Sequence, residues 1–417
     1  MMTFEDSRSA LGGLHPQWRI ASVSKYIPYP SVTHAGGQYV GQHLGALADF
    51  AAIELFAPDT PLNRAAMPQF DVSASSELMR GVGPGATGRF KTLFDVESAW
   101  AGSAVAWPYR RLFQTDRAPW SALGASGLIE FHWSEMIALA PDVRRRLPDA
   151  VLVGIAHDVI TQRWERAADA AANPLVRGAY SLAARRSRVQ ESRSFRDLDV
   201  LLVFSEKDAA LASALAPETR VEVVHPGLGP TMPVKRDVDA ASPVVLFTGA
   251  LNRPDNERGI LWFLDRIWPF ISTDFPSARL VIAGANAQTG LIRAVSRAPR
   301  ASLTGFVESL DPWYAQAAVF VAPLLTGAGV KFKTIDAMLR GVPVVSTTVG
   351  AEGIDASGLF ASVTDDPREF AAAVVTELRE PDRGRAAAAQ RWADGVYGER
   401  AFRDRLRTLY GELLSGR

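Results

Sequence analysis

Residues 323–353 read PLLTGAGVKFKTIDAMLRGVPVVSTTVGAEG, and this stretch predicts the fold of the C-terminal half of the chain. It follows the continuously apolar run 319–322, which is typical of a strand buried on both faces. A glycine-bearing loop comes next, and a helical pattern then runs from about residue 333 to residue 340. Gly341 stands where a helix commonly ends, and Pro343 opens another apolar run. The stretch therefore predicts a strand, a loop, a helix and a second, parallel strand.

The loop between the first strand and the helix has the composition of an anion-binding site. Gly327 and Gly329 allow a ligand to approach the backbone closely. The start of the helix presents unpaired backbone N–H groups and the positive end of its dipole, and both favour phosphate. Lys331 and Lys333 add positive charge there, and Asp336, placed in the first helical turn, could accept hydrogen bonds from ribose hydroxyls. Taken alone, the loop could also be a tight connection with surface lysines.

Short apolar runs alternate with helical patterns along most of the chain. Because most of these runs are continuously apolar, they are typical of strands in parallel sheets that helices cover on both faces. We therefore expect an α/β protein in which each half is a Rossmann-like domain. The expected strands are residues 19–23, 52–56, 127–131, 150–156, 200–204, 221–224, 244–248, 279–283, 302–304, 319–322 and 343–346.

Residues 226–243 separate two groups of strands and are interpreted as the interdomain linker. They hold four prolines and two glycines and show no helical period. The expected domains are residues 1–228 and 229–395. Residues 396–417 have the pattern of an amphipathic helix, which we expect to pack back on the N-terminal domain. Residues 61–120 are expected to form an irregular, partly helical insertion.

Composition excludes several classes of protein. The chain has 417 residues, which suits two domains, and its 45 basic and 45 acidic residues leave no overall charge to attract nucleic acid. The absence of cysteine excludes disulfides and thiolate metal sites and fits a reducing compartment. We see neither a signal peptide nor the roughly 18 apolar residues of a membrane span, and expect a cytoplasmic protein. Arginines before residue 200 form either a solvated helix face or a patch that faces anionic lipid at the inner membrane face or an anionic acceptor.

A set of motifs in the C-terminal half resembles the donor-binding segment of one enzyme family. These motifs are Phe247-Thr248-Gly249, Leu303-Thr304-Gly305-Phe306-Val307, Ala337-Met338, Pro343-Val344-Val345 and Gly350-Ala351-Glu352-Gly353. They are similar to those of retaining GT-B glycosyltransferases of the group-1, glycogen-synthase-like superfamily. The resemblance is strong over about residues 244–355 and weaker over 19–50 and 150–226. It implies a GT-B fold, in which two Rossmann-like domains have parallel sheets facing across an interdomain cleft.

The resemblance implies roles for single positions. Lys331 and Lys333 would neutralise the diphosphate, and Asp336 stands where the family usually has a glutamate that holds the ribose. A second glutamate, which binds the sugar in many relatives, is replaced by Ala328, so that sugar contacts would rest on backbone groups from Gly329 to Lys331. The other donor-binding positions implied are Gly36 and Gly37 at the start of the first helix, Gly249 beside the diphosphate, Gly305, Phe306 and Val307 near the base, and Val330.

His157 is the catalytic candidate of the N-terminal half. It follows the buried run 150–156, so we expect it at the carboxyl end of a sheet, where open α/β sheets bind ligands. The family often has a histidine here that contacts the donor sugar, and a structurally bonded histidine is the alternative. Glu130 and Glu135 flank another strand end and could meet an acceptor hydroxyl, whereas His132 has a weaker claim.

The resemblance implies transfer of a sugar from a nucleoside-diphosphate sugar to a hydroxyl acceptor, with retention at the anomeric carbon. Charge develops on the leaving diphosphate, and helix N-termini with two lysines would stabilise it, so we expect no metal and no further cofactor. The acceptor would be a glycan, a lipid-linked glycan or a small molecule, and no nucleic acid partner is expected. A nucleotide-sugar epimerase on the same fold and a non-catalytic nucleotide-sugar-binding homologue are the alternatives.

Overall fold

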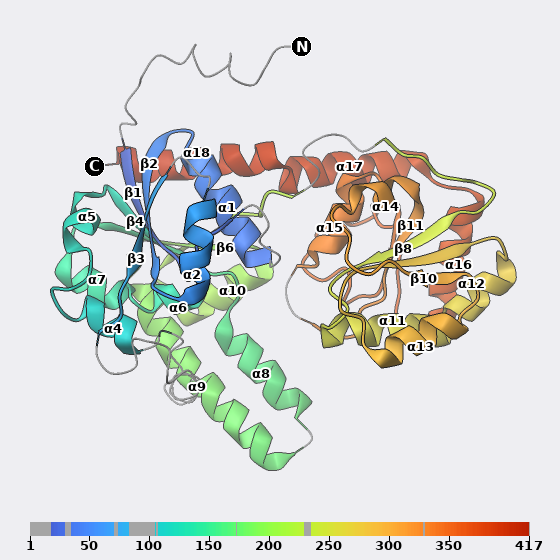
Figure 1. Ribbon diagram of the computed structural model, residues 1–417, viewed down its shortest axis with the longest axis horizontal. Helices are drawn as coiled ribbons and strands as arrows, with labels where there is room; N and C mark the ends of the chain where they lie inside the picture. The colour runs from blue at the N-terminus through green and yellow to red at the C-terminus, as the bar shows by residue number, and fades with distance from the viewer. Residues whose placement is uncertain are drawn as a thin grey trace, which may run out of the picture. The chain divides into compact units, whose positions relative to one another are not determined.

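The computed structural model describes residues 18–29, 35–70, 74–82, 105, 107–171, 173–228, 235–327 and 330–416. The chain divides into two compact units. We call residues 1–224 together with 403–417 the N unit, and residues 225–402 the C unit. Each unit is built on one parallel sheet, and Figure 1 labels the helices that pack on it. The predicted α/β class with two parallel-sheet domains is therefore confirmed.

The described part of the N unit contains a seven-stranded sheet in the order β3-β2-β1-β4-β5-β6-β7, and all neighbouring strands are parallel. The chain runs outward from β1 to β3 and then returns to β4 on the other side of β1. A topological switch point, where α/β proteins bind ligands, therefore lies between β1 and β4. The strands are β1 (Trp18–Val23), β2 (Ala51–Pro58), β3 (Ala74–Met79), β4 (Leu128–His132), β5 (Val151–Ile155), β6 (Val200–Val203) and β7 (Arg220–Val223).

Helices connect the strands of the N unit, because parallel neighbours cannot be joined by a tight hairpin. Two of them, α8 and α9, pack side by side as a hairpin that extends from the domain in Figure 1. The helices are α1 (Ala35–Leu47), α2 (Pro61–Ala66), the 3₁₀ helix η1 (Met67–Gln69), α4 (Trp107–Phe113), α5 (Trp120–Ala125), α6 (Trp133–Ile137), α7 (Ala140–Arg146), α8 (Ile160–Ala170), α9 (Pro174–Arg196) and α10 (Glu206–Leu215).

The C unit has a six-stranded parallel sheet over its described residues, in the order β10-β9-β8-β11-β12-β13. Here β8 and β11 are neighbours, and the chain leaves β8 in one direction and resumes at β11 in the other. The switch point of this unit therefore lies between β8 and β11. The strands are β8 (Val244–Thr248), β9 (Arg279–Ala283), β10 (Ala301–Leu303), β11 (Ala317–Ala322), β12 (Val344–Ser346) and β13 (Ser362–Val363).

Glycines let the helices of the C unit approach the carboxyl ends of its strands. A Cβ atom at Gly259 would lie only 2.5 Å from the carbonyl oxygen of Pro323, so α11 packs against the residue that follows β11 through this glycine. The helices are α11 (Pro254–Arg266), α12 (Trp268–Asp274), α13 (Thr289–Arg297), α14 (Asp311–Gln316), α15 (Phe332–Leu339), α16 (Pro367–Arg379) and α17 (Arg383–Tyr397).

The last helix, α18 (Glu399–Ser415), belongs mostly to the N unit. Its apolar side chains Leu406, Leu409 and Tyr410 are almost completely buried there. At the edge of this buried surface, Arg405 forms an ion pair with Glu222 of β7 at 2.7 Å, which also holds α18 against the sheet. None of the described helices has the length and hydropathy that a bilayer crossing requires.

Strand prediction was accurate in the cores of both units and missed one edge strand in each. Residues 244–248 and 279–283 are strands with the predicted bounds, and most other predicted strands differ by one or two residues. Residues 74–79, which we placed in an irregular insertion, form the edge strand β3. Half of its sequence, ASSELM, is polar, because an edge strand is only partly covered. The short edge strand β13 was missed for the same reason.

Candidate active site

The site of the C unit lies at its switch point, where the N-termini of α11 and α15 meet. Lys333, in the first turn of α15, donates a hydrogen bond to the side-chain oxygen of Asn256, in the first turn of α11. A Cβ atom at Gly249, which follows β8, would lie 2.8 Å from the Lys333 nitrogen and 2.9 Å from the Asn256 amide. Any larger residue at this position would force the two side chains to move, so the predicted residues Gly249 and Lys333 lie in close contact. Two helix dipoles and an amine then favour an anion.

Lys333 is held in an environment that disfavours its charged form. Its nitrogen lies 4.7 Å from the ring centre of Phe247, and the side chain is only partly exposed. Burial, with smaller contributions from Arg253 and Lys331, lowers the pKa of Lys333 to about 7. An incoming anion would reverse this effect by favouring the protonated amine.

Lys331 has a different environment from Lys333. It precedes α15 as its N-terminal cap residue, is 9% exposed in its side chain, and pairs with Glu352 at 3.4 Å. On the same loop, the hydroxyl of Thr326 donates to Asp255 of α11 at 2.7 Å. Gly327 lies against Asp255 with a backbone φ of +127°, a conformation that favours glycine. The carboxylates of Glu352 and Asp255 therefore offset part of the positive charge of this loop.

Asp336 is further along α15 than the sequence suggested. The helix begins at Phe332, so Asp336 is its fifth residue and lies in the second turn, which corrects the expected position. Its carboxylate accepts a hydrogen bond from Arg340 at 3.0 Å. Burial raises the pKa of Asp336, and Arg340 opposes that shift. Arg340 in turn lies 4.7 Å from the ring centre of Tyr314.

The remaining predicted donor positions of the C unit lie at two other strand ends. Gly305, Phe306 and Val307 follow β10, and Gly305 has a φ of +71°. Phe306 is 72% exposed, which is unusual for a large apolar side chain beside a strand end. Val330 packs near Gly353, where an added Cβ would lie 3.1 Å from it. Gly329 and Ala328 lie outside the described residues.

In the N unit, the predicted Gly36 and His157 lie together beside the switch point. Gly36 is in the first turn of α1, and a Cβ atom there would lie 3.1 Å from the ring of Trp133 and 3.4 Å from His157. His157, two residues after β5, stacks on Trp133 with ring centres 4.4 Å apart. The half-buried imidazole also has the edges of Tyr39 and Phe204 within about 5 Å of its ring centre. Gly37 follows in α1 and is buried.

Trp133 was missed by sequence reasoning. It directly follows β4 and has a φ of +69°, a left-handed conformation that is rare for a bulky residue. Such backbone outliers concentrate at functional sites and persist where the surrounding structure holds them. The neighbouring Ser134 donates to the carbonyl of Asp158 at 3.0 Å, which links the ends of β4 and β5. Nothing in the local sequence marks Trp133 for this role.

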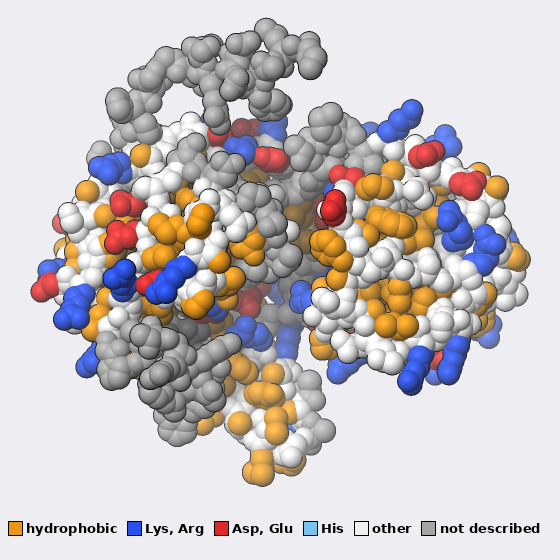
Figure 2. All heavy atoms as spheres, in the orientation of Figure 1, with side chains coloured by type: hydrophobic (Ala, Val, Ile, Leu, Met, Phe, Trp, Pro, Cys, Tyr) orange, Lys and Arg blue, Asp and Glu red, His pale blue; other side chains and the backbone are white. Residues whose placement is uncertain are grey.

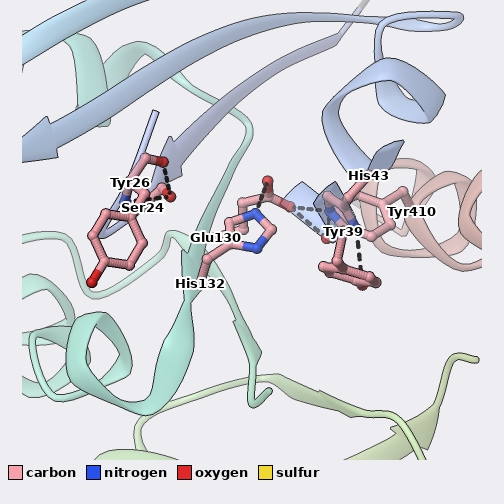
Figure 3. A network of polar contacts seen from close by, with 7 residues as sticks. All are labelled: Ser24, Tyr26, Tyr39, His43, Glu130, His132 and Tyr410. Atoms are coloured by element: carbon pink, nitrogen blue, oxygen red, sulfur yellow. Dashed lines mark hydrogen bonds and ion pairs between the residues drawn. The ribbon is translucent and has the colours of Figure 1, made fainter. Parts of the chain in front are cut away.

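Glu130 and His132 do not reach a ligand surface, which corrects the expectation for Glu130. Both are completely buried and bonded to each other at 3.1 Å. Figure 3 shows the network, in which Glu130 also receives hydrogen bonds from His43 of α1 at 3.0 Å and Tyr410 of α18 at 2.5 Å. Burial alone would raise the pKa of Glu130, but the two histidines hold it well below its usual range. Glu135 is paired with Lys25 at 2.9 Å.

The buried network is also a set of side chains with metal-ligand chemistry. The ligand atoms of His43, Glu130 and His132 lie within 4.8 Å of one another. Each of the three already takes part in a hydrogen bond within the network, and the hydroxyl of Tyr410 lies against the carboxylate. We assign the network a structural role, because it ties α1, β4 and α18 together in the core.

Comparison with protein families identifies the C unit. The family model described as Glycosyl transferases group 1 matches residues 242–380. These residues are a group 1 glycosyl transferase domain. The match spans β8 to α16 and therefore includes Gly249, Asn256, Lys331, Lys333 and Asp336.

The chain is also similar to a curated protein and to solved structures. A Klebsiella pneumoniae protein described as "Uncharacterized 44.6 kDa protein in cps region" is 36% identical over 117 residues, which cover 26% of this chain and 30% of that protein. Anabaena HepE, crystallised with UDP, is 12% identical with a TM-score of 0.63, and the match covers 94% of this chain and 100% of HepE. WaaG, a glycosyltransferase involved in lipopolysaccharide biosynthesis, is 13% identical with a TM-score of 0.61 and coverages of 94% and 100%. The predicted GT-B fold is therefore confirmed.

Several site residues of the glycosyl transferase domain were not among the predicted ones. Asn256 and Asp255 open α11, and Glu352 follows β12, so their contacts with the lysine-bearing loop come from distant parts of the chain. A signal for Asn256 was present, since a polar residue just inside a helix that follows a strand often faces the strand's carboxyl end. The pairing of Glu352 with Lys331 had no sequence signal.

Proposed function

We propose that this protein transfers a sugar from a nucleoside-diphosphate sugar to a hydroxyl acceptor. The observation that carries the proposal is the cluster of Lys333, Asn256 and Gly249 within the matched glycosyl transferase domain. HepE, which shares the fold, was crystallised with UDP and with UDP-glucose. We take the same class of donor for this chain.

The C unit would bind the diphosphate through groups that are already in place. The first turns of α11 and α15 meet beside Gly249, and the amine of Lys333 lies there, hydrogen-bonded to the side chain of Asn256. Because its pKa is about 7, Lys333 takes up a proton when the anion arrives and then carries a full charge against the leaving group. Stabilising the charge that develops on a leaving group is the largest single contribution in many enzymes.

The nucleoside would occupy the ends of β8 and β10. The exposed ring of Phe306 offers a flat apolar surface for a base, and stacking on such a ring is worth about 1–3 kcal/mol. Asp336 is the acceptor for ribose hydroxyls in this proposal, and it would exchange part of its contact with Arg340 for them. Gly305, Val307, Val330 and the backbone near Gly329 complete the donor site.

The N unit contributes His157, with Gly36 and Gly37 beside it. A neutral imidazole both donates and accepts hydrogen bonds, which suits sugar hydroxyls. We propose that His157 contacts the transferred sugar or the acceptor hydroxyl, and that the Trp133 ring fixes its plane. The proposal includes retention at the anomeric carbon by departure and attack on the same face, a cytoplasmic location, and an acceptor that is a glycan, a lipid-linked glycan or a small molecule.

We further propose that no metal and no cofactor besides the donor takes part. The cations Lys331 and Lys333 and the two helix N-termini supply positive potential where the diphosphate would lie. Activity should then survive EDTA. If EDTA abolished turnover and Mg²⁺ or Mn²⁺ restored it, this part of the proposal would be wrong.

The test of the function begins with nucleotide binding. UDP, GDP and ADP are compared by thermal shift, and the sugar forms of the nucleotide that stabilises most are then incubated with candidate acceptors and analysed by mass spectrometry. Binding at a hundredfold excess over the dissociation constant stabilises by about 2.7 kcal/mol, which a melting curve detects. A glycosylated acceptor supports the transferase. Interconversion of the donor sugar without an acceptor would support an epimerase, and binding without any reaction would support a non-catalytic homologue.

A further inference from the structure

The hairpin of α8 and α9 is a firmly built element of the N unit. Its base is fixed by Glu191, a buried residue of α9 whose carboxylate accepts from the backbone N–H of Ile160 at 2.7 Å and from the hydroxyl of Thr161 at 2.6 Å. Further out, the rings of Trp164 and Tyr180 stack with centres 5.7 Å apart. Asn173 caps the start of α9 through its side-chain oxygen. These contacts fix α8 and α9 against each other, so the side chains on the outside of the hairpin form a defined surface.

The outer face of α9 carries an apolar stripe that no described part of the chain covers. Leu175, Leu182 and Val189 are 85%, 43% and 70% exposed, and their spacing of seven residues places them on one side of the helix. The opposite side is the buried one. It consists of Ala183, Ala184, Ser187, Glu191, Ser194 and Phe195. Figure 2 shows hydrophobic side chains gathered at the end of the hairpin, the lowest part of the view.

The charges on the outer face are all positive. Helix α9 has six arginines and one acidic residue, Glu191, which is buried. Arg188 pairs with Glu165 of α8 at 2.5 Å, whereas the exposed Arg185, Arg193 and Arg196 fall on the same side of the helix as the apolar stripe. Apolar side chains next to arginines on one exposed helix face are the composition of a helix that lies at a membrane surface.

We propose that the outer face of α9 binds the surface of an anionic lipid bilayer, with Leu175, Leu182 and Val189 inserted between headgroups. Arg185, Arg193 and Arg196 then contact lipid phosphates, and their long side chains reach the headgroup level. This peripheral contact is independent of the nucleotide site. A second copy of the chain fits this face less well, because a symmetric dimer would place the arginines of one α9 helix against those of the other. A nucleic acid would leave the apolar stripe unused.

The proposal is tested by sedimenting the full-length protein with vesicles of phosphatidylcholine alone and of an equimolar mixture with phosphatidylglycerol. We expect binding to the anionic vesicles, weakened by high salt, and little binding to the neutral ones. One arginine near an anionic membrane surface raises the binding constant about fivefold. The triple variant R185Q/R193Q/R196Q should therefore bind the anionic vesicles about a hundredfold more weakly than the wild type. The double variant L175S/V189S should bind the anionic vesicles at least about tenfold more weakly than the wild type.

Matched variants elsewhere control for charge and exposed apolar area. R293Q/R297Q/R391Q removes the same charge from other exposed positions, and L62S/I292S removes two side chains that are 50% and 49% exposed. Both should bind vesicles like the wild type. The proposal would be overturned if the wild-type protein did not sediment with the anionic vesicles. It would also be overturned if the control variants lost as much vesicle binding as the α9 variants. A wild-type dimer that dissociates in L175S/V189S by analytical ultracentrifugation would also overturn it, in favour of a second copy.

Discussion

Replacing Lys333 by methionine should change both the affinity for a nucleoside diphosphate and its dependence on pH. In the free protein the pKa of Lys333 is about 7, because burial, Arg253 and Lys331 disfavour the ammonium form. A bound diphosphate lies against the amine and should restore a pKa near its ordinary value of 10.5. Nucleotide binding should therefore take up about half a proton at pH 7 and close to one proton at pH 9.

The size of the effect follows from the fraction of Lys333 that is protonated before binding. About half of the amines carry a proton at pH 7 and about one in a hundred at pH 9, so the wild-type affinity should fall about fiftyfold over this interval. The methionine side chain in K333M cannot be protonated, so the nucleotide affinity of this variant should not change between pH 7 and pH 9. A charge-assisted hydrogen bond is worth about 1.5–3 kcal/mol, so K333M should bind roughly ten- to a hundredfold more weakly at pH 7, and the two proteins should converge toward pH 9.

Isothermal titration calorimetry between pH 7 and pH 9, in two buffers with different heats of ionisation, measures the affinity and the proton uptake together. K235M is the matched control, since Lys235 is exposed in the same unit and its removal should leave both quantities unchanged. The reasoning is refuted if the wild-type affinity is flat over this range, or if K333M keeps the wild-type slope. The same shift makes the free protein gain stability as the pH rises from about 7 toward 10.5, because the unfolded chain binds the extra proton there.

Further predictions concern single side chains in each unit. G249A should weaken nucleotide binding about tenfold or more while the C unit stays folded, because its Cβ would displace the amine of Lys333 by direct contact at 2.8 Å; an unchanged dissociation constant would contradict this. F306A should raise the dissociation constant by roughly five- to a hundredfold for nucleotides and leave that for pyrophosphate unchanged. H157A should lower kcat more than it raises KM for the donor, whereas a purely structural histidine would lower only the melting temperature. Y410F removes the 2.5 Å bond to Glu130 and should destabilise the N unit by about 1.5–3 kcal/mol, seen as a lower Tm with nucleotide affinity unchanged.

A single sequence was enough to predict the two parallel sheets, and it also predicted a donor site at a particular loop of the chain. Strands buried on both faces are mostly apolar, so β8 and β9 could be predicted with their bounds from a single sequence. The loop at residues 326–333 was also readable, because glycines and lysines at the start of a helix have few structural reasons to occur together. The amphipathic period likewise predicted α18 and its buried face.

Which polar side chains are structural and which are open to a ligand could be seen only once the chain was folded. Glu130 lies inside the apolar strand β4, where His43 and Tyr410 enclose it from positions 87 and 280 residues away in the chain. The low pKa of Lys333 likewise depends on its burial and on the charge of Arg253, which belongs to a distant part of the chain. Solvation and pairing set these properties, and both depend on contacts between distant segments. No local sequence pattern records them, whereas the strand and helix periods are local and can be read directly.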